Sequence, residues 1–225
     1  MINSSETILF LSGAGLSPWI WDDVRRELPF ASVVAPRPTA DAPSLRDYAE
    51  AAIAAVDDDT FTVVAHSIGG VVASEILRLA PERVNGVLAV SAVVPRSGES
   101  FVSAMPFPNR VILPLALRLG GTRPPESAIR RGLGHGLDET LADRIVTDFT
   151  TEPRELYPDR TRGHSWTGRA GYLMTTQDRE LSESMQQRFA GRLAGDWRES
   201  IPTGHLPMLQ DSSETAASIA RFIAA

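Results

Sequence analysis

The feature that most constrains the fold is an alternation of short apolar runs with amphipathic segments. Apolar runs at residues 7–13, 30–36, 60–66 and 84–94 are rich in aliphatic residues, and segments of helical periodicity follow the first three. Parallel strands need a crossover connection, and strands buried on both faces are nearly continuous apolar runs. The alternation therefore predicts an α/β fold with a mostly parallel sheet flanked by helices.

The same alternation returns near the C-terminus. Further strands are expected at 170–176 and at 196–202, and the polar character of the second favours the sheet edge. Helices are expected over 18–28, 44–57, 68–82, 181–194 and 212–224. Ser44 and Ser212 are expected to cap two of these helices, and Asp47 adds an imperfect capping box to the first. The pattern predicts roughly six strands in one sheet.

The interval between Pro95 and Ser165 interrupts this alternation. It is too long for a plain connection, and it contains three segments of helical character. These segments are 109–119, 124–131 and 138–149. We predict a helical insertion at 95–165 that forms a cap over one end of the sheet, with a core domain made of 1–94 and 166–225.

Composition removes several classes of chemistry and partner. The chain has no cysteine and no lysine, which excludes disulfides, thiolate catalysis and Schiff-base chemistry. A net charge of −6 gives no basic stripe for nucleic acid. No apolar run has the length of a membrane span, and the N-terminus lacks the pattern of a signal peptide. We expect a cytoplasmic monomer or homodimer that acts on a small molecule and needs neither a metal nor an organic cofactor.

Ser67 lies where a predicted strand meets a predicted helix, in the stretch VVAHSIGG. Ala65 and Gly69 stand two residues before and after it, and a tight strand-to-helix turn brings these two positions together. Only small residues fit there, which is the reason for the G-x-S-x-G pattern around a nucleophilic serine. The alternative is that Ser67 only caps the helix. A nucleophile also needs a base, an acid and donors for an oxyanion.

The candidate base is His205, which follows the last predicted strand. Ligands of open α/β sheets bind at the carboxyl ends of the strands, so this loop brings the imidazole within reach of Ser67. Three other histidines are available. His66 is expected to pack against the sheet, and His135 and His164 are expected on the surface or facing the substrate.

The candidate acid is Asp178, which follows the predicted strand at 170–176. A carboxylate fixes the tautomer of a catalytic histidine and stabilises its charged form. Glu99 and Glu180 also lie near strand ends and remain rivals, and Asp178 capping the next helix is the structural alternative.

Donors for an oxyanion are expected from the N–H of Ile68 and from the loop after the first strand. Ala14 is the first choice in that loop and Gly15 the second.

Four stretches, FLSGAGLSPWIWDDV, VVAHSIGGVVA, YLMTTQD and GHLPML, resemble the α/β-hydrolase superfamily. They look most like its small branch of plant methyl esterases and hydroxynitrile lyases and the bacterial relatives of these. The resemblance covers nearly the whole chain except the insertion. It implies a nucleophile at Ser67, an acid at Asp178, a base at His205, and donors at Ile68 and Ala14. It also implies that the insertion forms much of the substrate pocket.

This chain departs from the family pattern at the end of the first strand. Ser12 and Gly13 stand where the family usually has His-Gly, so this loop is expected to be held differently. The lyases of the branch use a lysine near the catalytic histidine and a threonine hydroxyl where this chain has Ala14. Because neither group is present, the resemblance favours ester chemistry over cyanohydrin cleavage.

The substrate pocket is expected to be apolar. Its predicted lining comprises Gly15, Trp19, Phe101, Met105, Phe107, Leu115 and Leu206, with Val111 and Leu119 as further candidates. The alternative is that the residues of the insertion only bury it against the sheet. We expect a serine hydrolase that cleaves a small to medium, fairly apolar ester through an acyl-enzyme. Two alternatives remain open: a non-hydrolytic enzyme of the same fold (a lyase, a cyclase or a cofactor-free oxygenase) and a binding module without catalysis.

Overall fold

In residues 6–162 and 168–225, which the computed structural model describes, six parallel strands form one sheet in the order β2-β1-β3-β4-β5-β6. The strands are β1 (Thr7–Leu11), β2 (Ala31–Val34), β3 (Phe61–Ser67), β4 (Val84–Ala92), β5 (Arg169–Thr175) and β6 (Trp197–Ile201). The parallel six-stranded sheet is therefore confirmed, and β6 lies at its edge as predicted.

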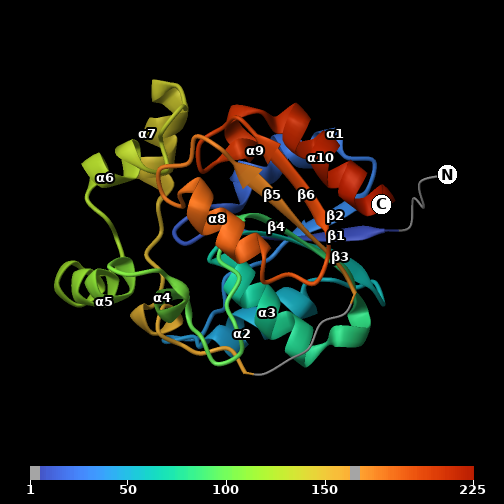
Figure 1. Cartoon of the computed structure of the whole chain (residues 1–225), viewed down its shortest axis with the longest axis horizontal. Helices are drawn as coiled ribbons and strands as arrows, with labels where there is room; N and C mark the ends of the chain where they lie inside the picture. The colour runs from blue at the N-terminus through green and yellow to red at the C-terminus, as the bar shows by residue number, and fades with distance from the viewer. Residues whose placement is uncertain (1–5, 163–167) are drawn as a thin grey trace.

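Helices cover both faces of the sheet (Figure 1). One face carries α2 (Leu45–Ala54), α3 (Gly69–Leu79) and α8 (Glu183–Ala190), and the other carries α1 (Asp22–Glu27), α9 (Pro207–Gln210) and α10 (Ser212–Ala224). Side chains of each strand alternate between the two cores: Leu9 and Leu11 of β1 face α2 and α3, and Ile8 and Phe10 face α1 and α10. Because the inner strands β1, β3, β4 and β5 are buried on both faces, their sequences are largely apolar, and the edge strands β2 and β6 are more exposed.

The segments that follow β1 and β3 leave the sheet toward opposite faces, to α1 and α3 respectively. Because β1 and β3 are neighbours, a crevice opens between their carboxyl ends, and such a switch point is where open α/β sheets bind ligands. Three short 3-10 helices lie between these elements: η1 (Pro18–Trp21), η2 (Pro81–Arg83) and η3 (Arg154–Leu156). The predicted helix at 18–28 is η1 followed directly by α1.

Two helix starts test the capping predictions. Ser44 and Asp47 form a complete capping box at α2, with each side chain accepting the other's backbone N–H. The prediction for α10 was wrong by one residue. Asp211 caps this helix, because its carboxylate accepts the N–H of Glu214, and Ser212 already has its place inside the helix and donates its hydroxyl to Glu27.

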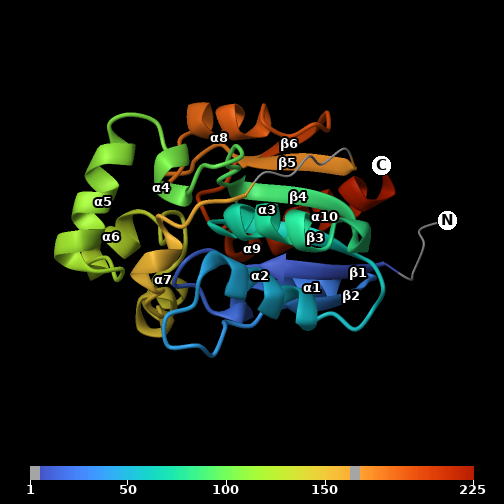
Figure 2. The same cartoon turned by 90° about the horizontal axis from the view of Figure 1, so that it is seen from below.

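Between β4 and β5 the chain forms α4 (Phe101–Ala104), α5 (Asn109–Gly120), α6 (Glu126–Arg131) and α7 (Glu139–Asp148). The last three correspond to the predicted helices, and α4 is too short to give a periodic signal. Figure 2 shows α5, α6 and α7 beyond the carboxyl ends of the strands. His164 and the predicted boundary at residues 165 and 166 lie outside the described residues. No described helix combines the length and the apolar character needed to cross a membrane.

Candidate active site

Ser67 occupies a strained turn between β3 and α3. Its φ is +56°, in the left-handed region, which costs a residue other than glycine on the order of 1 kcal/mol or more. The turn needs a small residue two positions later, because a Cβ on Gly69 would lie 2.9 Å from the carbonyl oxygen of Leu11 in β1. Ile68 takes the capping position of α3, and no side chain caps that helix. The alternative that Ser67 is a helix cap is therefore wrong.

His205 and Asp178 meet at the carboxyl ends of the last two strands. Nδ1 of His205 lies 2.8 Å from Oδ2 of Asp178, and the two side chains are 2% and 0% exposed. Burial lowers the pKa of His205, but the carboxylate outweighs burial through its charge and its hydrogen bond. The pKa of His205 therefore lies above its ordinary value of 6.5.

The carboxylate of Asp178 accepts several further hydrogen bonds. The hydroxyls of Ser91 and Thr175 donate to Oδ2, and the N–H groups of Glu180 and Leu181 donate to Oδ1. Burial raises the pKa of Asp178, but the charge of His205 and the hydrogen bonds to the carboxylate together lower it by more than burial raises it. The pKa of Asp178 therefore falls well below the usual range. The acid therefore stays ionised at neutral pH.

Ser91 is a residue of this network that the sequence reasoning missed. It lies next to the last residue of β4, and its φ is +41°. Its Oγ lies 3.2 Å from Nδ1 of His205 and donates a hydrogen bond to Asp178. The signal available in the sequence was its place as the polar residue in the run VLAVSAVV, next to the strand that carries Ser67.

The two rival acids lie elsewhere. Glu99 pairs with Arg192 at 3.0 Å and accepts the N–H of Arg96. The side chain of Glu180 lies against Gly132, and Glu180 contacts Asp178 through its backbone N–H alone. Of the described acids, Asp178 is the one that the structure brings into contact with His205.

His66 is fully buried beside the site, as predicted. Its Nε2 lies 2.8 Å from the carbonyl oxygen of His205, so Nε2 carries the proton and donates it. Burial, and then the charge of His205, lowers the pKa of His66 to about 3, and the ring is neutral at pH 7. His66 therefore orients the backbone that carries His205. His135 is half-buried, and its carbonyl packs against Gly204.

The loop that follows β1 (residues 12–17, here the β1 loop) packs directly on the serine turn. A Cβ on Gly13 would lie 3.0 Å from Cβ of Ser67, so only glycine permits this approach. Ser12 accepts a hydrogen bond from Trp21, which is how this chain holds the strand end where the family pattern differs. The N–H of Gly15 donates to Glu152 and is not free for a substrate. Among the described residues, no acceptor contacts the N–H of Ala14.

Ser67, His205 and Ala14 line one cavity of about 580 Å³. Most of its wall is apolar. The wall includes Leu16, Phe101, Met105, Ile112, Leu113, Leu117, Ile129, Leu133, Phe149, Tyr157 and Leu181, with Arg123, Asn109 and Glu180 as polar members. Of the predicted lining, Phe101 and Met105 lie in this wall.

The other predicted lining residues lie elsewhere, and each has a physical reason. Phe107 and Leu115 are 74% and 56% exposed. Phe107 precedes α5, and Leu115 lies on the side of α5 that is turned to solvent, as do the further candidates Val111 and Leu119. Trp19 stacks under Arg144 and donates to Asp148. Leu206 packs in the core below α10, and the ring of Phe149 covers Gly15.

Comparisons with solved structures give the same fold at low identity. An extracellular α/β-hydrolase from a Paenibacillus species, described as sharing structural and functional homology with tobacco salicylic acid binding protein 2, matches with a TM-score of 0.83 at 15% identity. The match covers 96% of this chain and 98% of that one. A pyrethroid hydrolase from Sphingobium faniae matches with a TM-score of 0.75 at 20% identity, covering 98% of both chains.

Tomato methylketone synthase I, in complex with 2-tridecanone, matches with a TM-score of 0.77 at 11% identity, and 96% of this chain and 97% of that one are covered. No curated protein matches the chain. The model of the alpha/beta hydrolase family matches residues 8–218, nearly the full length, and the chain belongs to this family.

Proposed function

We propose that the protein is a serine hydrolase that cleaves small to medium carboxylic esters with an apolar acyl or alcohol part. Ser67 is the nucleophile, His205 the general base and Asp178 the residue that orients the imidazole. The N–H groups of Ile68 and Ala14 receive the oxyanion. The observation that carries the proposal is the buried His205–Asp178 pair, whose imidazole shares a cavity with the strained Ser67.

The chemistry follows from these positions. Nε2 of His205 takes the proton of Ser67 as the hydroxyl attacks the ester carbonyl, and Asp178 stabilises the imidazolium that forms. The oxyanion accepts hydrogen bonds from the two backbone donors. The imidazolium then protonates the leaving alcohol, and the acyl-enzyme is released by a water that His205 activates in the same way.

The cavity supports an apolar substrate. Its volume of about 580 Å³ and its wall of aliphatic and aromatic side chains favour a medium-sized apolar group over a charged one. Helices α4, α5 and α6 supply much of that wall, which supports a cap at 95–165 above a core formed by 1–94 and 166–225. The similarity to a pyrethroid hydrolase also supports hydrolytic chemistry.

The test is a screen of 4-nitrophenyl, methyl and lactone esters over acyl chains of increasing length, with Ser67→Ala beside the wild type. We expect a burst of alcohol release from the wild type, and a loss of kcat in Ser67→Ala of roughly 10⁴-fold or more. The matched control is Ser184→Ala, an exposed serine that is expected to leave kcat unchanged.

Two outcomes would contradict the proposal. Full activity in Ser67→Ala would remove Ser67 from the mechanism. No turnover of any ester by the wild type would favour the non-hydrolytic alternative, for which the similarity to methylketone synthase I provides a precedent in this fold.

A further inference from the structure

The segment at residues 148–152, made of the last residue of α7 and the four residues after it, runs beside the β1 loop. The N–H of Thr150 donates to the carbonyl oxygen of Gly15 at 3.0 Å, and the indole N–H of Trp19 donates to Asp148 at 2.9 Å. More than 100 residues separate the two segments in sequence, so the insertion holds the loop that carries the proposed oxyanion donor.

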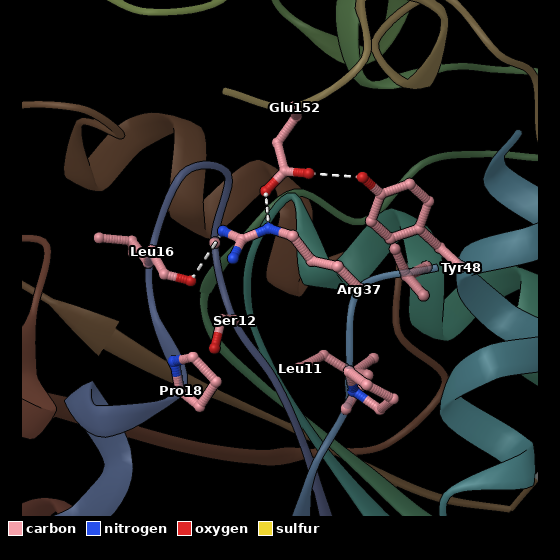
Figure 3. A pocket seen from close by; sticks show the side chains of 11 residues that line it. Leu11, Ser12, Leu16, Pro18, Arg37, Tyr48 and Glu152 are labelled. Carbon is pink, nitrogen blue, oxygen red and sulfur yellow. Dashed lines mark hydrogen bonds and ion pairs between the residues drawn. The ribbon is translucent and has the colours of Figure 1, made fainter. Parts of the chain in front are cut away.

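The centre of this contact is the side chain of Glu152. It is 5% exposed, and Oε1 accepts both the N–H of Gly15 at 3.1 Å and Nε–H of Arg37 at 3.0 Å. Its second oxygen accepts the hydroxyl of Tyr48 from α2. Figure 3 shows the carboxylate between Arg37 and Tyr48. Burial, and then the bond to Glu152, raises the pKa of Tyr48, so the phenol keeps its proton and donates.

Arg37 extends the same network to the next peptide group. Its second guanidinium nitrogen donates to the carbonyl oxygen of Leu16 at 3.1 Å (Figure 3). The ion pair therefore holds the β1 loop at two successive residues, Gly15 through its N–H and Leu16 through its C=O. A buried carboxylate left without its cation would be strongly destabilising, so each member of the pair depends on the other.

This arrangement has a consequence for the proposed chemistry. The N–H of Gly15 is occupied, and its hydrogen bond fixes the orientation of the peptide group that joins Ala14 to Gly15. Ala14, one residue earlier, lines the cavity together with Ser67, and its N–H has no described acceptor. A negative charge this close would oppose an oxyanion, and the guanidinium of Arg37 cancels much of it.

We propose that Glu152 is a positioning residue: with Arg37 it locks the β1 loop so that the N–H of Ala14, and not that of Gly15, serves the oxyanion. The inference rests on the proposed ester hydrolysis. It assigns to the insertion a part in transition-state stabilisation besides its part in the cavity wall. Glu152 does not touch the substrate and acts through the backbone of Gly15.

The test compares Glu152→Ala with Glu152→Gln, and with Glu155→Ala as the matched control because Glu155 is exposed three residues away. We measure kcat and KM for the best ester, and the affinity for an alkyl trifluoromethyl ketone, which forms a tetrahedral adduct with a nucleophilic serine. The corresponding alkyl alcohol, which forms no adduct, reports on binding in the cavity alone.

Glu152→Ala is expected to lower kcat by roughly 10- to 100-fold with little change in KM, because a displaced oxyanion donor acts on the transition state alone. The affinity of Glu152→Ala for the trifluoromethyl ketone falls by the same factor, and its affinity for the alkyl alcohol stays equal to that of the wild type. Glu152→Gln retains an oxygen that accepts the N–H of Gly15 and keeps most of the activity. The double variant Glu152→Leu/Arg37→Met removes both charges and leaves no buried ion without its partner, and it gives the same signature if Glu152→Ala does not fold.

Three outcomes would overturn the inference. The first is a kcat of Glu152→Ala equal to that of Glu155→Ala, the second is an equal loss of kcat in Glu152→Ala and Glu152→Gln, and the third is a change in KM alone. Each would show that Glu152 does not position an oxyanion donor. If the wild type neither cleaves esters nor binds the trifluoromethyl ketone, the proposed function itself is overturned. This result is distinguishable from the other three, because it is seen in the wild type without any substitution at residue 152.

Discussion

Ser91 joins the two buried partners of the proposed catalytic pair. Its hydroxyl donates to Asp178 and lies 3.2 Å from Nδ1 of His205. Each donor to the carboxylate disperses negative charge that would otherwise attract the imidazolium. Removing the hydroxyl of Ser91 therefore strengthens the interaction between Asp178 and charged His205, and raises the pKa of His205 further.

This effect predicts a shift in the pH profile. In the proposed mechanism only neutral His205 accepts the proton of Ser67, so kcat/KM is expected to fall as the pH drops through the pKa of His205, which lies above 6.5. In Ser91→Ala we expect this acid limb to move to higher pH. Measurements of kcat/KM between pH 5 and 9 for the wild type and Ser91→Ala check this shift, with Ser184→Ala as the control. A limb that stays in place or moves to lower pH would contradict the prediction.

At the scale of elements, the packing of α3 on β1 decides where the serine turn lies. A Cβ on Gly69 would meet the carbonyl oxygen of Leu11 at 2.9 Å and its Cβ at 3.0 Å, and backbone cannot move aside as a flexible side chain does. Any side chain at this position pushes the start of α3, and Ser67 with it, away from the sheet.

Gly69→Ala is therefore expected to destabilise the protein by about 1–3 kcal/mol and to lower kcat. Urea denaturation followed by circular dichroism measures the first effect, and the ester assay the second. Gly191→Ala is the matched control, because a Cβ at the end of α8 would have only ordinary contacts, at 3.5 Å or more, and Gly191 does not line the cavity. A Gly69→Ala protein as stable and active as Gly191→Ala would show that the close approach is not required.

Helix α5 presents two apolar faces, one of which lines the cavity. Leu113 and Leu117 are in the cavity wall, and Leu115 and Leu119 are exposed. We expect Leu117→Trp to fill part of the cavity and to lower kcat/KM for octanoyl esters roughly tenfold more than for acetyl esters. Leu115→Trp adds the same volume on the outer face and is expected to leave the chain-length preference unchanged. Equal effects of the two variants would contradict this assignment of faces.

At the scale of the whole molecule, the sequence predicted what depends on local pattern. Continuous apolar runs and the spacing of crossovers are enough for the parallel sheet, and the rule that sites lie at carboxyl ends brought Ser67, Asp178 and His205 to one edge. These inferences need no knowledge of which side chain contacts which.

What the sequence did not reveal depends on long-range register. Ser91 looks like any small polar residue until β4 is aligned with its neighbours, and Glu152 contacts Gly15 across 137 positions of the chain. The inner and outer faces of α5 are equally apolar, so periodicity gives no means of orienting it. Asp211 and Ser212 are both good caps, and only backbone dihedral angles decide between them.

The dihedral angle of Ser67 has a consequence for how such a chain tolerates change. A φ of +56° suits glycine better than serine, so stability alone would favour replacing this residue. The fold gives up part of its stability at a serine that lines the cavity, and the apolar core on both sides of the sheet supplies the surplus. Substitutions that weaken the core far from the cavity therefore reduce the margin within which a strained serine is tolerated, and they limit activity without touching the site.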